Sequence, residues 1–193
     1  SGRQTYLPPM TPDNPHLDAA LGVTIPARHA RGRAVRLGPA LDSILSRHAY
    51  PPAIEKLLAE ALALTALLGS LLKDPGGQMT LQAQTKGGII DLLVCDYLGG
   101  ELRGYVRHDP ALLADSPRAP SLQSLFGEGY LAITFDQPAT KERYQGIVPL
   151  EGESLADAAQ SYFGQSEQIP SIVRLAAEKI DGQWVSGGLL FQH

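Results

Sequence analysis

The chain has 193 residues, of which 44% are hydrophobic and 19% charged, and its formal net charge is −4 at pH 7. A chain of this length fits one domain, or a domain with a small appendage, and can bury about 70% of its unfolded surface, so stability requires neither a metal ion nor a disulfide. Lysine and arginine are scattered along the chain, which argues against nucleic acid as the main partner, and a single cysteine without a secretory signal predicts a cytosolic protein.

The first 29 residues are predicted to be a flexible lead-in, because prolines at positions 8, 9, 12 and 15 disfavour both helix and strand. The domain itself is predicted to span residues 30–193. Its first strand is Ala30–Leu37, where arginines alternate with apolar residues as in a half-exposed strand. A short helix that begins near Pro39 follows this strand.

A long helix is predicted from Ile54 to Leu72, where leucines recur with alanines between them. Apolar residues surround most of its axis, so we expect the helix to be buried on more than one side. Pro51 and Pro52 mark its start, and a proline and two glycines follow its end. The segment never reaches about 18 uninterrupted apolar residues, so we expect it to support the domain rather than cross a membrane.

Three extended runs after the long helix predict a β-meander. They are Met79–Thr85, Ile89–Tyr97 and Glu101–Arg107, and glycine pairs separate them. The second run is rich in isoleucine, leucine and valine, which predicts a central strand covered on both faces, with the long helix as the cover. Cys95 lies at the end of this run without a histidine or lysine beside it, so we expect a buried, inert thiol.

The second half of the chain begins with a long loop, Asp109–Ser121, and then predicts two hairpins with a helix between them. The hairpin strands are Tyr130–Phe135, Tyr144–Leu150, Ser171–Ala177 and Trp184–Phe191. Ser154 is the expected N-cap of the helix, Asp157 its capping-box partner, and Gly164 its end. Strands interleaved with few helices indicate an α+β fold with a large, mostly antiparallel (mixed) sheet, packed helices and one long buried helix.

Residues with catalytic or metal-binding chemistry are sparse. The five histidines show no metal-ligand spacing, and one cysteine cannot supply a zinc site built from cysteine pairs. The sequence has no nucleophile elbow and no phosphate-binding loop. Only His108 and Asp109, with Ser116 nearby in the sequence, hint at a hydrolase. We therefore expect no enzymatic activity, no cofactor and no metal site within this chain.

One set of motifs is more specific than the rest of the sequence. Its residues are Arg143, Tyr144, Gln145, Gly146, Glu151, Gly152, Tyr162, Phe163, Ser166, Glu167, Gln168 and Pro170. These motifs resemble the N-terminal domain of the heat-shock protein 33 family, as do the long Leu/Ala helix and the motifs at residues 42–45, 48–51, 102–104 and 187–192. The resemblance covers nearly all of the chain from about Arg31 onward.

This resemblance implies a cytosolic chaperone that binds unfolding polypeptides under oxidative and heat stress, without ATP hydrolysis and without catalytic residues. In the family, a C-terminal domain binds zinc through four cysteines, whose oxidation releases the zinc and promotes dimer formation. None of those cysteines is in this chain, and Cys95 matches none of their positions. We therefore expect a piece of a longer protein that holds clients without an oxidant. The implied partners are unfolded or partly folded proteins and a second copy of the chain.

A chaperone of this kind needs exposed apolar surface, because burial of apolar area does not require matched hydrogen bonds. The sequence offers two places for it, the sheet face away from the long helix and the helix itself. The candidate client-binding residues are Leu57, Leu58, Leu64, Leu68, Leu189 and Phe191. The strand Leu189–Phe191 also offers an edge for pairing in a homodimer. The alternative is a small-molecule-binding α+β module without chaperone activity, which requires an enclosed apolar pocket.

Overall fold

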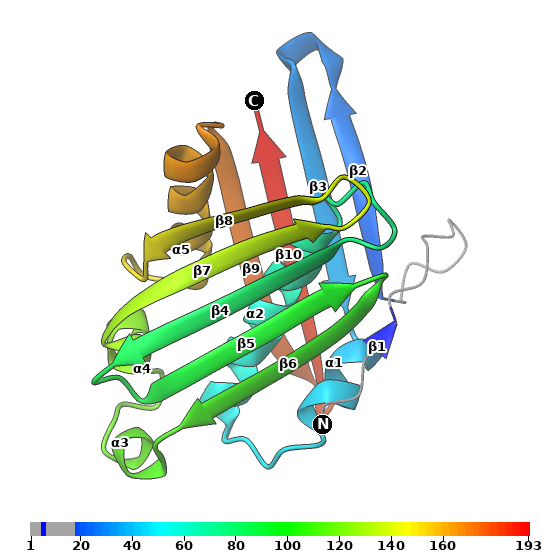
Figure 1. The fold of residues 1–193 in the computed structure, drawn as a ribbon. Coiled ribbons are helices and arrows are strands. Elements are labelled where there is room, and N and C mark those ends of the chain that lie inside the picture. Colours follow the sequence, from blue (N-terminus) through cyan, green and yellow to red (C-terminus); the bar gives the residue numbers. More distant parts are fainter. Residues whose placement is uncertain (1–4, 7–17) are drawn as a thin grey trace.

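The strands of the chain form two separate sheets, and the longest helix lies between them (Figure 1). This computed structural model describes residues 5–6 and 18–193. The six-stranded sheet has the order β1-β6-β5-β4-β7-β8, and the four-stranded sheet has the order β2-β3-β10-β9. All pairs of named strands in the described residues are antiparallel. The predicted α+β class is confirmed, with the strands divided between two sheets rather than joined in one.

The meander and both predicted hairpins are present. The six-stranded sheet consists of β1 (Thr5–Tyr6), β4 (Gln78–Lys86), β5 (Ile90–Leu98), β6 (Glu101–His108), β7 (Glu128–Gln137) and β8 (Glu142–Pro149). The four-stranded sheet consists of β2 (Ala19–Ile25), β3 (Ala30–Leu37), β9 (Ser171–Ile180) and β10 (Gln183–Gln192). The helices are α1 (Pro39–Leu45), α2 (Pro52–Gly69), α3 (Pro110–Ala114), α4 (Leu122–Phe126) and α5 (Leu155–Tyr162), with a 3-10 turn η1 (Pro26–Arg28) and a π-helical turn η2 (Phe163–Glu167).

Helix α2 forms the centre of the core, because it packs against strands of both sheets. Thirteen of its 18 residues are buried, which explains why its sequence has no continuous polar stripe. The helix ends at Gly69 rather than at Leu72, and the Ser70 hydroxyl donates a hydrogen bond to the Leu67 carbonyl at 2.6 Å. Within the described residues, no helix is long and apolar enough to span a membrane.

The six-stranded sheet is covered by α2 on one face only. In β5, Leu93 and Cys95 are buried on the inner face, whereas Leu92 and Val94 are half-buried on the outer face. The prediction that β5 is covered on both faces is therefore wrong, whereas the long helix does cover its inner face. The neighbouring strands partly shield its outer side chains instead, as Gln82 of β4 and Tyr105 of β6 pair with Val94 from either side.

The domain begins before Ala30, because β2 pairs with β3 over residues 19–25. Asp18 holds the start of this hairpin against α1. Its buried carboxylate accepts hydrogen bonds from the backbone N–H groups of Gly38 at 2.6 Å and Ala40 at 2.9 Å, and so caps the first turn of α1. Residues 1–4 and 7–17 of the predicted lead-in lie outside the described residues.

Helix α5 begins after Ser154 as predicted, but the Ser154 side chain makes no capping hydrogen bond. The Asp157 carboxylate instead accepts a hydrogen bond from the backbone N–H of Glu153 at 2.8 Å. The helix does not stop at Gly164, because the chain continues into the π-helical turn η2. Gln168, in the left-handed conformation with a φ of 55°, ends that turn.

Candidate functional site

The outer face of the four-stranded sheet, which is turned away from α2, is apolar. Strand register places side chains alternately on the two faces, and buried residues such as Val35, Val173 and Leu190 face the core. The residues between them face outward. Seven large apolar side chains on the outer face have exposed fractions of 36–52%. One of them, Ile180, lines the groove described below. We call the other six the apolar face: Leu21, Val23, Ile25, Ile172, Leu189 and Phe191.

The apolar face is continuous across all four strands. Val23, Gly32, Phe191 and Ile172 form one cross-strand row. Gly32 leaves room for the Phe191 ring, because a Cβ atom at Gly32 would lie only 2.8 Å from a carbon of that ring. The ring therefore lies across β3 and connects the apolar residues of β2 with those of β9 and β10.

A shallow groove of about 450 Å³ lies beside this row on the same sheet. It forms where the small residues Gly187 and Ala176 stand opposite each other on β10 and β9. Leu189, Ile180 and the exposed Arg174 line the groove. Its predominantly apolar lining fits an apolar side chain of a partner polypeptide.

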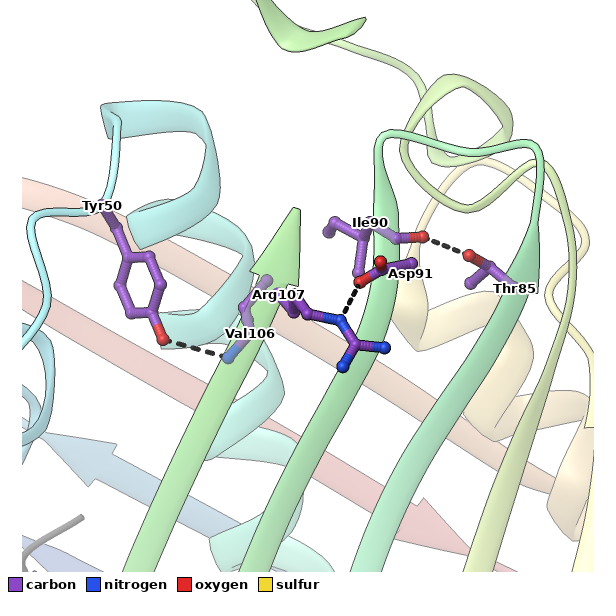
Figure 2. A network of polar contacts seen from close by, with 6 residues as sticks. All are labelled: Tyr50, Thr85, Ile90, Asp91, Val106 and Arg107. Carbon is purple, nitrogen blue, oxygen red and sulfur yellow. Dashed lines mark hydrogen bonds and ion pairs between the residues drawn. The ribbon is translucent and has the colours of Figure 1, made fainter. Parts of the chain in front are cut away.

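The outer face of the six-stranded sheet also exposes Tyr105, Tyr130 and Ile147, at 42–60%, but it differs from the apolar face in its cross-strand polar contacts. The Asp96 carboxylate accepts a hydrogen bond from the Thr80 hydroxyl at 2.7 Å and pairs with the Arg103 guanidinium at 3.6 Å. Near one end of the sheet, the Arg107 Nε donates a hydrogen bond to the Asp91 carboxylate at 2.8 Å (Figure 2). These cross-strand contacts satisfy polar groups on a solvated face, so the two sheets of the domain differ in chemistry.

Two further contacts in Figure 2 have a structural role. The Tyr50 hydroxyl, which lies in the connection between α1 and α2, accepts a hydrogen bond from the backbone N–H of Val106 at 3.0 Å. The Thr85 hydroxyl of β4 donates a hydrogen bond to the backbone carbonyl of Ile90 in β5. Tyr50 belongs to one of the motifs that carry the resemblance, and its position shows that this residue ties a helix connection to the sheet.

The predicted client-binding residues separate into two groups. Four of them have exposed fractions of 5% or less, because α2 is enclosed between the sheets: Leu57, Leu58, Leu64 and Leu68. They form core rather than surface. Leu189 and Phe191 do lie on the exposed apolar face. Their strand β10 runs between β3 and β9, however, so the predicted pairing edge at Leu189–Phe191 is wrong because both edges of β10 are already paired.

The contribution of β2 to the apolar face is not among the features predicted from the sequence. The prolines near the start of the chain favour a lead-in, and this interpretation extends too far. A signal is present, because Leu21, Val23 and Ile25 alternate with Gly22 and Thr24 at the period of a strand. Ile172 is placed correctly in a strand, but only the packing of the sheet against α2 shows that its side chain faces solvent.

The family-motif residues gather where β8 meets α5 and η2. A Cβ atom at Gly146 of β8 would lie 2.3 Å from the Tyr162 ring, so only glycine fits beneath that ring. The Tyr162 hydroxyl donates a hydrogen bond to the Glu167 carboxylate at 2.7 Å, and the Tyr144 hydroxyl donates one to the Ser166 carbonyl at 2.9 Å. Burial and the Glu167 carboxylate both raise the pKa of Tyr162, so its phenol stays protonated.

The other motif residues continue this arrangement. Phe163 is buried against Tyr162, with ring centroids 5.2 Å apart. The Gln145 amide donates a hydrogen bond to the Thr134 hydroxyl of β7 at 2.9 Å, and the Pro170 carbonyl accepts one from the backbone N–H of His193 at 3.2 Å. Gly152 adopts a φ of 99° before α5, while Arg143 and Glu151 are exposed. The motif therefore fixes α5 on the edges of both sheets.

Comparison with known proteins identifies the family. The profile of the family described as Hsp33 protein matches residues 18–193, which is most of the chain. This chain belongs to the Hsp33 family. The predicted resemblance is thereby confirmed.

Relatives and a solved structure of the Hsp33 family match the chain over most of its length. The 33 kDa chaperonin of Caulobacter vibrioides is 46% identical over 169 residues, and that of Yersinia pestis is 40% identical over 168 residues. The matches cover 84% and 86% of this chain but 56% and 55% of those relatives, so the chain spans about half their length. The crystal structure of an Hsp33 homologue from Thermotoga maritima has a TM-score of 0.77 at 24% identity, covering 92% of this chain and 61% of that one.

The single thiol of this Hsp33-family chain is enclosed in the core. Cys95 is 0% exposed on the inner face of β5. Burial raises the pKa of its thiol to about 12, so almost none of it is thiolate at neutral pH. The prediction of a buried thiol is confirmed, and the high pKa agrees with low reactivity.

The residues that hint at a hydrolase have structural partners. The Asp109 carboxylate caps α3 by accepting hydrogen bonds from the backbone N–H groups of Ala111 and Leu112. The Ser116 hydroxyl donates one to the Leu113 carbonyl at 2.7 Å. In the described part of the chain, no group of three or more histidine, cysteine or acidic side chains could hold a metal ion. A cleft of about 840 Å³ lies near Lys86, and several polar residues line it. This cleft is open to solvent, whereas a small-molecule-binding module requires an enclosed apolar pocket.

Proposed function

We propose that this chain is an ATP-independent holdase that binds unfolding polypeptides on the apolar face and keeps them from aggregating. The observation that carries the proposal is the exposure of six large apolar side chains on the outer face of one sheet. Membership of the Hsp33 family supports it, because the relatives are named chaperonins. We place this activity in the cytosol, where a free thiol remains reduced.

The exposed area suits weak and general binding. Full burial of one such side chain contributes about 1.5–3 kcal/mol, and the exposed fractions here are near four-tenths, so covering all six contributes on the order of 5 kcal/mol. Part of that is offset by the loss of motion on association. A client segment therefore binds weakly and reversibly, and because apolar burial is non-directional, many unrelated sequences can use the same face.

Redox regulation does not involve Cys95 in our proposal. A redox sensor needs an accessible thiolate, and this thiol is buried with a raised pKa. The four-cysteine zinc site implied by the family resemblance also does not fit this chain, which contains one cysteine. We therefore propose that the chain holds clients constitutively and that residues outside it would provide any redox control of the whole protein.

Light scattering of a heat-unfolding client, measured at several chain-to-client ratios under reducing and oxidising conditions, tests the proposal. We expect the same suppression of scattering in both conditions. Suppression that begins only after peroxide treatment would contradict constitutive holding. No suppression even with the chain in excess would contradict the holdase function itself.

A further inference from the structure

The β2–β3 hairpin has two chemically different faces. Its outer face contributes Leu21, Val23 and Ile25 to the apolar face. Its inner face carries Arg31 and Arg33, which stand opposite Thr24 and Gly22 in the register. Residues 21–25 are exposed on both faces, and the turn of the hairpin projects beyond the six-stranded sheet in Figure 1. A partner beside β2 can therefore reach both faces.

The open edge of β2 lacks the usual protection against strand pairing. Among the described residues, β2 pairs with β3 alone, so its other edge is unpaired. The strand Ala19–Ile25 contains no charged residue and no proline, the two features that normally block pairing at an edge. The edge strand on the opposite side of this sheet, β9, carries Arg174, Glu178 and Lys179.

Positive charge accumulates beside this edge although the whole chain has a net charge of −4. Residues 19–37 include four arginines and no carboxylate. In the described part of the chain, none of these arginines forms an ion pair. The guanidinium of Arg33 lies over Gly22, with its atoms 4.0 Å from the position of a Cβ atom there, so it extends from β3 toward the open edge.

We propose that β2 binds an extended client segment as a fifth antiparallel or parallel strand, and that the preferred segment alternates apolar with acidic residues. This inference rests on the holdase function proposed above and names the class of client segment. Apolar side chains of the added strand extend the apolar face beside Leu21, Val23 and Ile25. The intervening carboxylates project to the other face, toward Arg31 and Arg33. Backbone hydrogen bonds to β2 supply binding that does not depend on side-chain identity.

Charge complementarity selects a client segment over a second copy of this chain. In a dimer paired through two β2 edges, the Arg33 guanidinium that extends over Gly22 in each copy would lie near the shared edge, without a carboxylate between the two copies. Like charges brought together in this way repel each other, so such a dimer is disfavoured. An acidic client neutralises the same arginines.

Fluorescence anisotropy with labelled peptides as long as β2 tests the inference. One peptide alternates valine with glutamate, a second alternates valine with lysine, and a third is the glutamate peptide with alternate amides N-methylated. We expect the glutamate peptide to bind about tenfold more tightly than the lysine peptide, since two attractive contacts replace two repulsive ones. High salt should reduce this difference, and N-methylation should remove most binding because it blocks backbone hydrogen bonds.

The variant Arg31→Glu/Arg33→Glu should reverse the preference between the glutamate and lysine peptides. Arg118→Glu/Lys141→Glu is the matched control, because it changes the net charge equally at exposed positions outside the hairpin. Peptide-dependent protection of β2 amides in hydrogen exchange should accompany binding. If the variant does not fold, the salt dependence of peptide binding to the unmodified chain tests the charge contribution instead, because high salt should reduce the preference for the glutamate peptide.

Equal binding of the glutamate and lysine peptides, or undiminished binding of the N-methylated peptide, would overturn the inference. So would a dimer in which β2 amides are protected without peptide. If client aggregation is still suppressed in that case, the holdase proposal stands. Loss of suppression in the unmodified chain would instead contradict the proposed function.

Discussion

Removing apolar surface from β10 should weaken client binding by a predictable amount. Leu189→Thr/Phe191→Thr places β-branched side chains, which favour strands, at two positions and removes two exposed apolar groups, whose exposed fractions are 44% and 36%. At about 2–3 kcal/mol for full burial of each side chain, a client that covers them loses about 2 kcal/mol, or roughly 30-fold in affinity. The chain-to-client ratio for half-maximal suppression of light scattering should rise accordingly.

The other sheet provides a matched control for this variant. Tyr130 and Ile147 on the outer face of the six-stranded sheet are more exposed, at 60% and 57%. Their replacement by threonine should leave suppression unchanged, because they lie outside the apolar face. Circular dichroism and thermal melting should show that both variants fold. Equal loss of suppression in both variants, or no loss in the β10 variant, would refute the placement of the client surface.

Four further predictions concern the core and its titrating groups. Replacing Cys95 by alanine should lower the free energy of unfolding by about 1–2 kcal/mol and leave client holding intact, whereas rapid native labelling of the thiol linked to loss of activity would contradict its inert role. Gly146→Ala should destabilise by about 1–3 kcal/mol in urea unfolding, because the new methyl group collides with the Tyr162 ring, and an unchanged midpoint would count against that contact. Asp18→Ala should cost about 1–3 kcal/mol, since two backbone N–H groups lose their acceptor, and an unaltered melting temperature would show that water replaces it. Burial raises the pKa of Glu60 above its ordinary value of 4.5, so the folded state loses stability as pH rises through the folded pKa and the buried carboxyl ionises. The free energy of unfolding of Glu60→Gln should therefore increase relative to that of the unmodified chain between pH 4 and pH 7. A difference between the two free energies that does not change with pH would contradict this sign.

Much of the secondary structure can be predicted from local patterns in the sequence. The Ala30–Leu37 strand is predicted at its observed bounds because arginines and apolar residues alternate there. The glycine pairs near positions 87 and 99 predict the turns of the meander, where residues with positive φ are required. The continuous apolar surface of α2 predicts burial on several sides, which the structure confirms.

Long-range pairing could not be predicted in the same way. Alternation along β10 and β9 predicts strands but contains no information about which strands share a sheet. The lead-in interpretation of residues 19–25 is wrong for a related reason, since the pairing with β3 and the capping by Asp18 stabilise a hairpin that has no strong local turn signal.

The sequence by itself determined the types of most elements, the central place of α2 and the family to which the chain belongs. Only the tertiary structure decided that Leu57 and Leu68 are core whereas Leu189 and Phe191 are surface. All four are apolar residues in regular elements, so composition and periodicity cannot separate them. The physical reason is that α2 is enclosed by two sheets and can bury its whole circumference, while the four-stranded sheet has one covered face and one open face.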